Sequence, residues 1–344
     1  MNVTLIGLGN IGSQLAPLLA RMPGAAAFTL IDHDRYAPEN LATQNIAPGD
    51  AGSAKAIAAG QRLREQHPHL RVTSIVQRVE DVPLGALRAD AIVSCVDSLA
   101  ARLTIAEAAW RLGVPCFDTG VLADGSLARV SIQVAGEDQP CLQCAWSDRD
   151  YARMEQRYVC QPAQSFSTNA PAWLGALAAS LAAGEIARLL AGDRSAAGKI
   201  LMLDAQHHTL TSTRVLRFEH CRFDHAVWPV ALLGARAHEA TLGALLSRED
   251  ASLRVWNQPW VSQRACTGCG RAESAWHLRG RLAADCECGA SLLPMGFHTI
   301  DAFTAAETPA DLLPRTFSSL GVRDGDVAAV TNSGAVRYIE FGTP

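Results

Sequence analysis

Residues 1–20 read MNVTLIGLGNIGSQLAPLLA, and this stretch decides the fold that the sequence predicts. An apolar run over residues 2–6 leads into Gly7, Gly9 and Gly12, and an apolar segment with helical spacing follows over residues 12–22. A strand, a glycine-rich turn and a helix in this order form the first unit of a Rossmann-like sheet, in which phosphates bind at the helix N-terminus. The motif by itself favours a dinucleotide such as NAD, and a tight turn without a ligand is the alternative.

The next predicted strand, over residues 26–32, leads into IDHDRYAPENLATQN, residues 31–45. An acidic residue at the end of this strand, here Asp32, is the usual partner of a nucleotide ribose. Polar residues then recur in the pattern D-x-D-x(5)-N-L-x(2)-Q, one of only two lysines follows in AGSAKA, and CVDSLAARL comes after a later strand. The residues that these three stretches add are Asp34, Asn40, Leu41, Gln44, Lys55, Asp97 and Arg102.

Together these residues resemble the adenylation core of the ThiF/MoeB and ubiquitin-activating-enzyme superfamily, over about residues 1–225. The resemblance implies an enzyme that binds ATP and adenylates the C-terminal glycine of a small ubiquitin-like or sulfur-carrier protein. It implies that Asp32 holds the ribose, that Lys55 contacts phosphates and that Asp97 serves Mg²⁺. The residues assigned to ATP are Gly7, Gly9, Asn10, Gly12, Asp32, Asp34, Asn40, Gln44, Lys55 and Asp97, and those assigned to catalysis include Lys55, Asp97 and Arg102.

The chemistry of adenylation fits these residue types. A carboxylate that attacks the α-phosphorus of ATP, with pyrophosphate leaving, needs donors on the phosphates, a metal ligand and a ribose anchor. The family usually has an arginine where this chain has Thr43, so Arg35, Arg102 or a partner subunit is expected to supply that charge. Other interpretations stay open, namely Asn40 and Gln44 as loop caps, Lys55 as a solvated helix residue and Asp97 as the N-cap of the next helix.

Strands and helices alternate through the first two thirds of the chain, which predicts an α/β fold with a Rossmann-like, doubly wound and mostly parallel sheet. The adenylation domain is expected over residues 1–225, with a crossover loop over 136–170 and a long helix over 171–191. A smaller, β-rich C-terminal domain is expected over 226–344. It should contain a helix over 237–250, a tryptophan-rich strand over 253–263 and a hairpin that turns at Asn332-Ser333-Gly334.

Ten cysteines in a chain that we expect to be cytoplasmic need an explanation other than disulfides. Cys141 and Cys144 form a C-x-x-C pair, and Cys221 and His225 are expected to complete a structural zinc site. The family resemblance implies a second cysteine pair at the latter position, where this chain has Cys-x-x-x-His. His220 is an alternative ligand, and thiols that are simply buried are the alternative to zinc.

A second cysteine set predicts a zinc ribbon over residues 255–298. Cys266 and Cys269 form one pair, and Cys286 and Cys288 form another after sixteen intervening residues. Two such pairs, each with a nearby glycine, are typical of a structural zinc knuckle. The alternative is a pair of disulfides.

Cys160 lies in RYVCQPAQSFSTNAP, the polar stretch that leads into the long helix. Family members that carry the ubiquitin-like protein as a thioester have a cysteine in such a loop, so the resemblance implies that Cys160 is a catalytic nucleophile. A thiol in this role must be exposed and acidified. An inert thiol and a sulfur-transfer group are the alternatives, whereas Cys95 and Cys116 are expected in the core.

The remaining composition is that of an ordinary soluble protein, with 49% hydrophobic residues and a net charge of −4. We therefore expect neither nucleic acid as a partner nor a membrane span. The resemblance implies a homodimer, and a conjugating enzyme is a further expected partner. Three other functions stay open: adenylation without a thioester step, an NAD(P)-dependent oxidoreductase, and an inactive binding scaffold.

Overall fold

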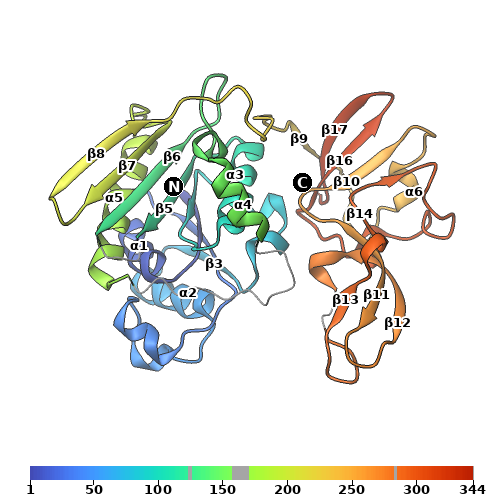
Figure 1. The fold of residues 1–344 in the computed structure, drawn as a ribbon, viewed down its shortest axis with the longest axis horizontal. Helices are drawn as coiled ribbons and strands as arrows, with labels where there is room; N and C mark the ends of the chain where they lie inside the picture. Colours follow the sequence, from blue (N-terminus) through green and yellow to red (C-terminus); the bar gives the residue numbers. More distant parts are fainter. Residues whose placement is uncertain (123–125, 157–169, 283–284, 344) are drawn as a thin grey trace. The chain divides into compact units, whose positions relative to one another are not determined.

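The computed structural model describes residues 1–344 except 123–125, 157–169, 283–284 and 344 (Figure 1). The chain forms two compact units. One comprises Met1–Val79 and Leu87–Val227, and the other comprises Glu80–Ala86 and Trp228–Pro344. The sequence analysis placed the domain boundary between residues 225 and 226, and it held no sign that the short stretch Glu80–Ala86 belongs to the second unit.

The first unit is built on an eight-stranded sheet with the strand order β3-β2-β1-β4-β5-β6-β7-β8. Neighbours from β3 to β5 pair in parallel, and neighbours from β5 to β8 pair antiparallel. The strand order reverses at β1 and β4, the point in an open α/β sheet where ligands bind beyond the carboxyl ends of the strands. The strands are β1 Asn2–Ile6, β2 Ala27–Ile31, β3 Arg71–Ile75, β4 Ala91–Ser94, β5 Cys116–Val121, β6 Leu127–Gln133, β7 Lys199–Asp204 and β8 Thr209–Arg214.

Helices cover both faces of this sheet, so the predicted doubly wound α/β fold is confirmed (Figure 1). α1 and α5 pack together on one face, where Leu5, Leu15, Phe28 and Leu174 are buried in a common core, and α3 packs on the other face against β4 and β5. The helices are α1 Asn10–Ala20, α2 Lys55–Gln66, α3 Leu99–Leu112, α4 Asp148–Gln156 and α5 Ala172–Leu190, with 3₁₀ turns that include η1 Pro38–Ala42 and η5 Leu142–Ala145.

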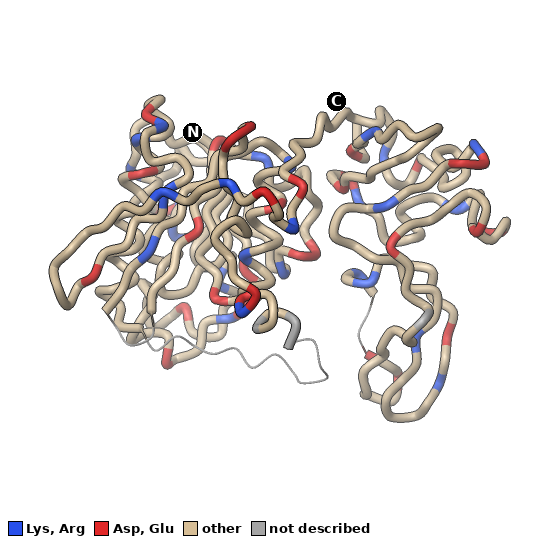
Figure 2. The backbone as a smooth tube through the Cα atoms, turned by 45° about the horizontal axis from the view of Figure 1, so that its top comes forward, with Lys and Arg blue, Asp and Glu red and all other residues tan. Residues whose placement is uncertain are grey.

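Among the described helices, α5 alone has the length and apolar composition of a membrane span. Half of its most apolar window is buried inside the protein, and the helix packs against α1, β5 and β6. These are the contacts of a core helix. Along the backbone, basic and acidic residues are interspersed over both units (Figure 2), in keeping with the small net charge of −4.

The second unit consists of two small sheets. One has the order β15-β10-β16-β17-β9, and in the other β11 pairs with β12, β13 and β14. The predicted hairpin is confirmed, because Ser333 and Gly334 have φ values of 50° and 76° between β16 and β17, as a two-residue type I′ turn requires. The strands are β9 Val230–Leu232, β10 Ser252–Val255, β11 Trp260–Cys266, β12 Ala272–Leu278, β13 Leu292–Pro294, β14 Thr299–Ile300, β15 Phe303–Thr304, β16 Val327–Asn332 and β17 Ala335–Glu340.

Two expected elements of the second unit are wrong. The helix predicted over 237–250 is only the four-residue α6, Leu242–Leu245, because the N–H groups of Leu242 and Gly243 donate to carbonyl oxygens of a distant segment, at 3.0 and 2.8 Å. The strand predicted over 253–263 is divided into β10 and β11. Asn257 between them has a φ of 52°, which no extended strand accommodates.

Candidate functional site

The glycine loop joins β1 to α1, and two of its positions admit only glycine. Gly7 has a φ of 87°, and a Cβ there would lie 2.7 Å from the carbonyl oxygen of Cys95. A Cβ on Gly12 would lie 1.9 Å from the carbonyl oxygen of Gly7. The loop therefore brings backbone N–H groups and the N-terminus of α1 close to the edge of the sheet, which is the arrangement that binds phosphate.

Asp32 follows β2 directly and is only 8% exposed. Its Oδ2 accepts the N–H of Leu8 at 2.7 Å, and its Oδ1 accepts the N–H of Asp34 at 2.9 Å. Burial raises the pKa of Asp32, and the nearby Lys55 opposes that shift. Each carboxylate oxygen has a second lone pair, so Asp32 can hold the glycine loop and still accept hydrogen bonds from two hydroxyls of a ribose.

Lys55 is the first residue of α2 and is buried, with 8% of its surface exposed. Its Nζ lies 3.1 Å from Oδ2 of Asp34 and 5.9 Å from the centre of the Tyr36 ring. The interpretation of Lys55 as a solvated helix residue is therefore wrong. Its ammonium group pairs with Asp34 and lies near Asp32, which itself bonds the glycine loop at Leu8, so it can offer positive charge to a phosphate.

Asn40 and Gln44 behave differently from each other. Oδ1 of Asn40 accepts the N–H of Ala37 at 2.9 Å, which is the loop-cap role that we considered for it. Oε1 of Gln44 is buried and has no hydrogen-bond partner in the described part of the chain, and the same holds for Oδ1 of Asn10 in the glycine loop. Gln44 lies against Gly9. The unpaired acceptor of Gln44 fits a ligand with a hydroxyl or amino donor, such as a nucleotide. Oδ1 of Asn10 faces α5 instead, because a Cβ on Gly175 would lie 1.9 Å from it.

Asp97 lies between β4 and α3, and its side chain is exposed. It is not the cap of the helix, because the N-cap of α3 is Ser98, whose Oγ accepts the N–H of Ala101 at 3.5 Å. β4 is the neighbour of β1 in the sheet, and the backbone of Cys95 contacts Gly7. Asp97 therefore emerges at the same edge as the glycine loop.

Arg102 is paired with an acidic residue that the sequence reasoning missed. Its Nη1 donates to both carboxylate oxygens of Asp118 at 2.7 and 2.8 Å, and Nη2 of Arg129 and Oγ of Ser94 donate to the same carboxylate at 2.6 and 2.9 Å. Asp118 is 1% exposed. Arg35, the other candidate for the missing family arginine, is exposed and donates to a backbone carbonyl oxygen.

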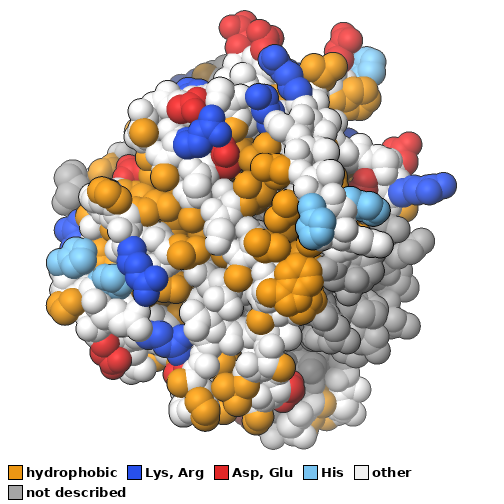
Figure 3. Space-filling view, turned by 90° about the vertical axis from the view of Figure 1, so that its left-hand side faces the viewer, with side chains coloured by type: hydrophobic (Ala, Val, Ile, Leu, Met, Phe, Trp, Pro, Cys, Tyr) orange, Lys and Arg blue, Asp and Glu red, His pale blue; other side chains and the backbone are white. Residues whose placement is uncertain are grey.

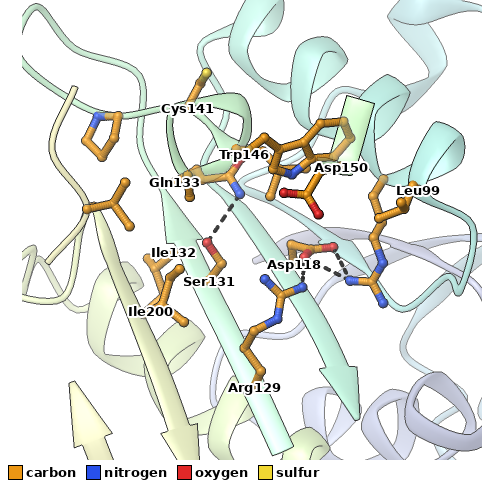
Figure 4. A pocket seen from close by; sticks show the side chains of 16 residues that line it. Leu99, Asp118, Arg129, Ser131, Ile132, Gln133, Cys141, Trp146, Asp150 and Ile200 are labelled. Atoms are coloured by element: carbon orange, nitrogen blue, oxygen red, sulfur yellow. Dashed lines mark hydrogen bonds and ion pairs between the residues drawn. The ribbon is translucent and has the colours of Figure 1, made fainter. Parts of the chain in front are cut away.

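A cavity of about 280 Å³ lies over β5, β6 and β7, beside this ion-pair cluster (Figure 4). Arg129, Ser131 and Gln133 of β6 line it, and its wall is the Pro140–Trp146 segment that contains the first cysteine pair. The sequence held a signal for these residues, because three polar side chains alternate with apolar ones along β6.

The first cysteine cluster comprises Cys141, Cys144, Cys221 and His225, as the sequence predicted, and its ligand atoms all lie within 4.8 Å of one another. Sγ of Cys141 lies 3.8 Å from Sγ of Cys144 and 3.7 Å from Sγ of Cys221, and Sγ of Cys144 lies 3.2 Å from Nε2 of His225. Thiolates bound tetrahedrally to zinc at about 2.3 Å lie about 3.8 Å apart, so the cluster fits such an ion.

The second cysteine cluster brings Cys266, Cys269, Cys286 and Cys288 together, again within 4.8 Å. Sγ of Cys266 lies 3.4 Å from Sγ of Cys288, and Sγ of Cys269 lies 3.8 Å from Sγ of Cys286. The N–H groups of Cys269 and Gly268 donate to Sγ of Cys266 and lower its pKa to about 6, which favours the thiolate that binds metal. All nine described cysteines are free, so the disulfide alternative finds no support among them.

The other cysteines and histidine that the sequence singled out are accounted for as follows. Cys160, the predicted nucleophile, lies outside the described residues. His220 is not a member of the first cluster, and its ring packs against Phe218. Cys116 is buried in the core as predicted, whereas Cys95 is partly buried and packs against the core. Loss of solvent around its thiol raises the pKa of Cys95 to about 12.

The first unit thus has the α/β fold that is typical of nucleotide-binding proteins. Asp32 and Asp97 lie with the glycine loop at the edge of its sheet, and the unit also contains the first cysteine cluster. The sequence model of the ThiF family matches residues 1–223, and the chain belongs to the ThiF family. The family that the sequence motifs implied is therefore confirmed.

Several relatives have names that describe their activity. The chain is 29% identical over 228 residues to the molybdopterin-synthase adenylyltransferase of Escherichia coli (strain K12). This alignment covers 64% of this chain and 85% of that protein. It is 26% identical over 222 residues to the sulfur carrier protein ThiS adenylyltransferase of the same strain, with 64% and 84% covered. It is 28% identical over 159 residues to the ubiquitin-like modifier-activating enzyme 5 of Oryza sativa subsp. japonica, with 42% and 37% covered.

Among solved structures, E. coli MccB with AMPCPP and MccA is similar in fold, with a TM-score of 0.51 and 20% identity. The alignment covers 64% of this chain and 66% of the MccB chain. The family match ends at residue 223, so the only part of the second unit that it includes is Glu80–Ala86.

Proposed function

We propose that the chain is an adenylyltransferase that uses ATP to activate the C-terminal glycine of a small ubiquitin-like or sulfur-carrier protein. The observation that carries this proposal is the meeting of the glycine loop, Asp32, Lys55 and Asp97 at the carboxyl edge of β1, β2 and β4. Relatives with this family domain are named adenylyltransferases of sulfur carriers and activating enzymes of ubiquitin-like modifiers. MccB, which shares the fold, has been crystallised with ATP.

In this mechanism the chain mainly positions and neutralises charge. The N–H groups of the glycine loop and the N-terminus of α1 hold the triphosphate, and Lys55 contacts its oxygens. Asp32 accepts the ribose hydroxyls, and Asp97 offers an oxygen ligand to Mg²⁺, which supplies charge neutralisation for the leaving pyrophosphate. A carboxylate oxygen of the carrier then bonds to the α-phosphorus, and the bond from that phosphorus to the bridging oxygen of pyrophosphate breaks.

The two cysteine clusters are assigned to structural Zn²⁺. Three thiolates with one imidazole, and four thiolates, are both ligand sets that tetrahedral zinc prefers. The first cluster joins the segment after β6 to the segment after β8, and the second joins the two ends of a ribbon in the second unit. Each ion would cross-link segments that are distant from each other in the chain.

A thioester step on Cys160 is a further part of the proposal. The thiolate of Cys160 would attack the carbonyl carbon of the carrier adenylate, and a C–S bond would form. The bond between that carbon and the phosphate oxygen would break, and AMP would leave with this oxygen. The thioester would pass to a conjugating enzyme. Without this step, the chain would stop at the carrier adenylate, which would react with an acceptor other than Cys160.

We also propose a homodimer in the cytoplasm. α5 exposes Trp173 and Leu177, one turn apart, and Leu190 at its other end, at 52%, 37% and 39% of their surfaces, on a helix whose most apolar window is half buried. Hydrophobic side chains gather on the adjoining side of the first unit (Figure 3). Exposed apolar clusters of this kind are typical of contacts between protein subunits. Free cysteines in metal-ligand sets suit a reducing compartment.

The test is ATP–pyrophosphate exchange with the full-length chain and small proteins that end in glycine. We expect exchange that depends on the carrier, that is lost in Asp97→Ala and that persists in Asp193→Ala, a surface aspartate far along the chain. A non-reducing gel of wild type and Cys160→Ala then reports the thioester as a reducible adduct. Absence of exchange with every carrier, together with absence of ATP binding, would contradict the proposal, whereas ATP binding alone would indicate an inactive scaffold.

A further inference from the structure

We propose that the cavity between the sheet and the first cysteine cluster binds an apolar side chain in the C-terminal tail of the carrier, and that a peptide N–H of the tail donates to Gln133. The proposal deepens the proposed function and rests on it. Three features carry it: the polar atoms of the cavity, its apolar wall and its position relative to Asp97.

The cavity holds one buried acceptor that lacks a donor. Gln133 is 4% exposed, and its Oε1 has no hydrogen-bond partner in the described part of the chain. Nε2 of Gln133 donates to Oγ of Ser131 at 3.5 Å, so the amide is oriented by its neighbour on β6 (Figure 4). An unpaired buried acceptor is costly, and a ligand that brings an N–H removes that cost.

The charges of the cavity favour a neutral ligand over a cation. Asp118 is already bonded by Arg102, Arg129 and Ser94. Asp150, at the rim, accepts the N–H and the hydroxyl of Ser147. Arg129 is one third exposed, and its guanidinium carries N–H groups beyond the one that bonds Asp118. An extended peptide matches this set, because one of its N–H groups can donate to Gln133 and a carbonyl oxygen further along it can accept from Arg129, four residues away on the same strand.

The apolar part of the cavity defines what accompanies that peptide group. Leu99, Leu142, Trp146, Ile200 and Val215 line it. At about 280 Å³, it lies below the range of about 300–1,000 Å³ that is usual for small-molecule sites. A single aliphatic or aromatic side chain on an extended peptide therefore suits the space better than a larger free ligand.

The position of the cavity indicates that this peptide is the carrier tail. Leu99 lines the cavity and comes two residues after Asp97, which emerges at the nucleotide edge. An extended chain advances about 3.3–3.6 Å per residue, so a tail anchored in the cavity reaches the edge with a few further residues. Only a chain end that reaches the edge can present its carboxylate to ATP.

The wall of the cavity depends on the first cysteine cluster. Cys141 is both a cluster member and a lining residue, and Leu142, Ala145 and Trp146 of the wall flank Cys144. A metal ion in the cluster would therefore fix the wall. Loss of that ion should weaken binding of the carrier tail. It should leave ATP binding unchanged, because the proposed nucleotide site is formed by the residues that follow β1, β2 and β4.

The test uses the full-length chain and fluorescent heptapeptides that end in Gly-Gly, in which one leucine is moved through the five preceding positions of a serine background. Anisotropy gives the dissociation constant of each peptide without ATP. We expect one leucine position to bind at least tenfold more tightly than the all-serine peptide. Gln133→Leu, which lacks the acceptor, and Ile200→Trp, which fills the space, should each lose that preference, and Thr211→Leu on the neighbouring strand β8 should keep it.

The role of the cluster is tested in the same assay. Cys221→Ser removes a ligand of the first cluster without altering a lining residue, and Cys288→Ser is the matched change in the second cluster. We expect weaker peptide binding, with an unchanged dissociation constant for ATP, only in Cys221→Ser. The inference would be overturned if all peptides bound equally, even when pyrophosphate exchange is normal. It would also be overturned if both Gln133→Leu and Ile200→Trp kept the preference of the wild-type chain for one leucine position. Failure of the proposed function would appear separately, as absence of exchange.

Discussion

Replacement of Asp118 by asparagine should destabilise the first unit strongly, because this carboxylate holds two arginines inside the protein. Asp118 is 1% exposed, and the side chains of Arg102 and Arg129 are 12% and 33% exposed. Four hydrogen bonds reach its two oxygens, at 2.6 to 2.9 Å. Asparagine retains one acceptor and places an NH₂ group against donors from the arginines.

The expected magnitude follows from the burial of the pair. When one partner of a buried ion pair is removed, the other charge stays buried without compensation, at a cost of about 3–5 kcal/mol. The asparagine side chain would keep part of the hydrogen bonding to Arg102, and Arg129 can move toward water because it is partly exposed. We therefore expect a loss near the lower end, about 3 kcal/mol in the free energy of unfolding of the first unit.

Hydrogen exchange measured by mass spectrometry suits this test, because it reports β5 and β6 separately from the second unit. Asp118→Asn should speed exchange in these strands by about 100-fold, which corresponds to about 3 kcal/mol. The control is Asp193→Asn, the same chemical change in an ion pair with Arg188 at the surface, where exchange should hardly change. Equal exchange in the two variants would refute the reasoning that Asp118 neutralises buried arginines.

Three further predictions concern the glycine loop, the metal sites and Asp32. Gly12→Ala should weaken ATP binding at least tenfold in a titration, because its Cβ would clash with the Gly7 carbonyl group, whereas Gly184→Ala in open space should not. Wild type should hold two zinc ions per chain by elemental analysis, and Cys144→Ser and Cys269→Ser should each lose one; fewer than two in wild type contradicts the assignment. Burial raises the pKa of Asp32, so the folded state favours the protonated carboxyl group more than the unfolded state does. The contribution of Asp32 to the free energy of unfolding therefore falls as pH rises from 3.8 through the raised pKa. Asp32→Asn should remove that slope from urea midpoints measured at rising pH above 3.8, and an unchanged slope would contradict the assigned direction of the shift.

The sequence predicted those features that depend on residues close together in the chain. The strand, glycine turn and helix around Gly7 and Gly12 are local, and so is each C-x-x-C pair, because a metal chelate needs only a short spacing. The nucleotide edge also followed from sequence, since parallel strands place the residues after β1, β2 and β4 at one edge. Family resemblance supplied the roles of these residues, which spacing alone does not give.

What the sequence did not predict depends on pairing between distant segments. A catalytic role of Arg102 stays a prediction, but its partner Asp118 was not predicted, because their contact is set by the packing of α3 against β5. The helix expected over 237–250 has a suitable pattern, but the backbone of Leu242 bonds instead to the Arg315 carbonyl oxygen. In the helix a tertiary contact outweighs a local preference, and in both cases the local pattern carries no trace of the distant partner.

The second unit is more than an addition after residue 227, because it includes Glu80–Ala86 from the connection between β3 and β4. The N–H of Gly85 donates to the Gly325 carbonyl oxygen at 2.8 Å, and Gln258 and Arg281 donate to carbonyl oxygens of Glu80 and Asp81. This connection leads into β4, and Asp97 follows that strand. A chain cut after residue 227 would leave the connection without its hydrogen-bond partners. Truncation would therefore disturb the strand that supports the proposed metal ligand, and for this reason adenylation should be measured on the whole chain.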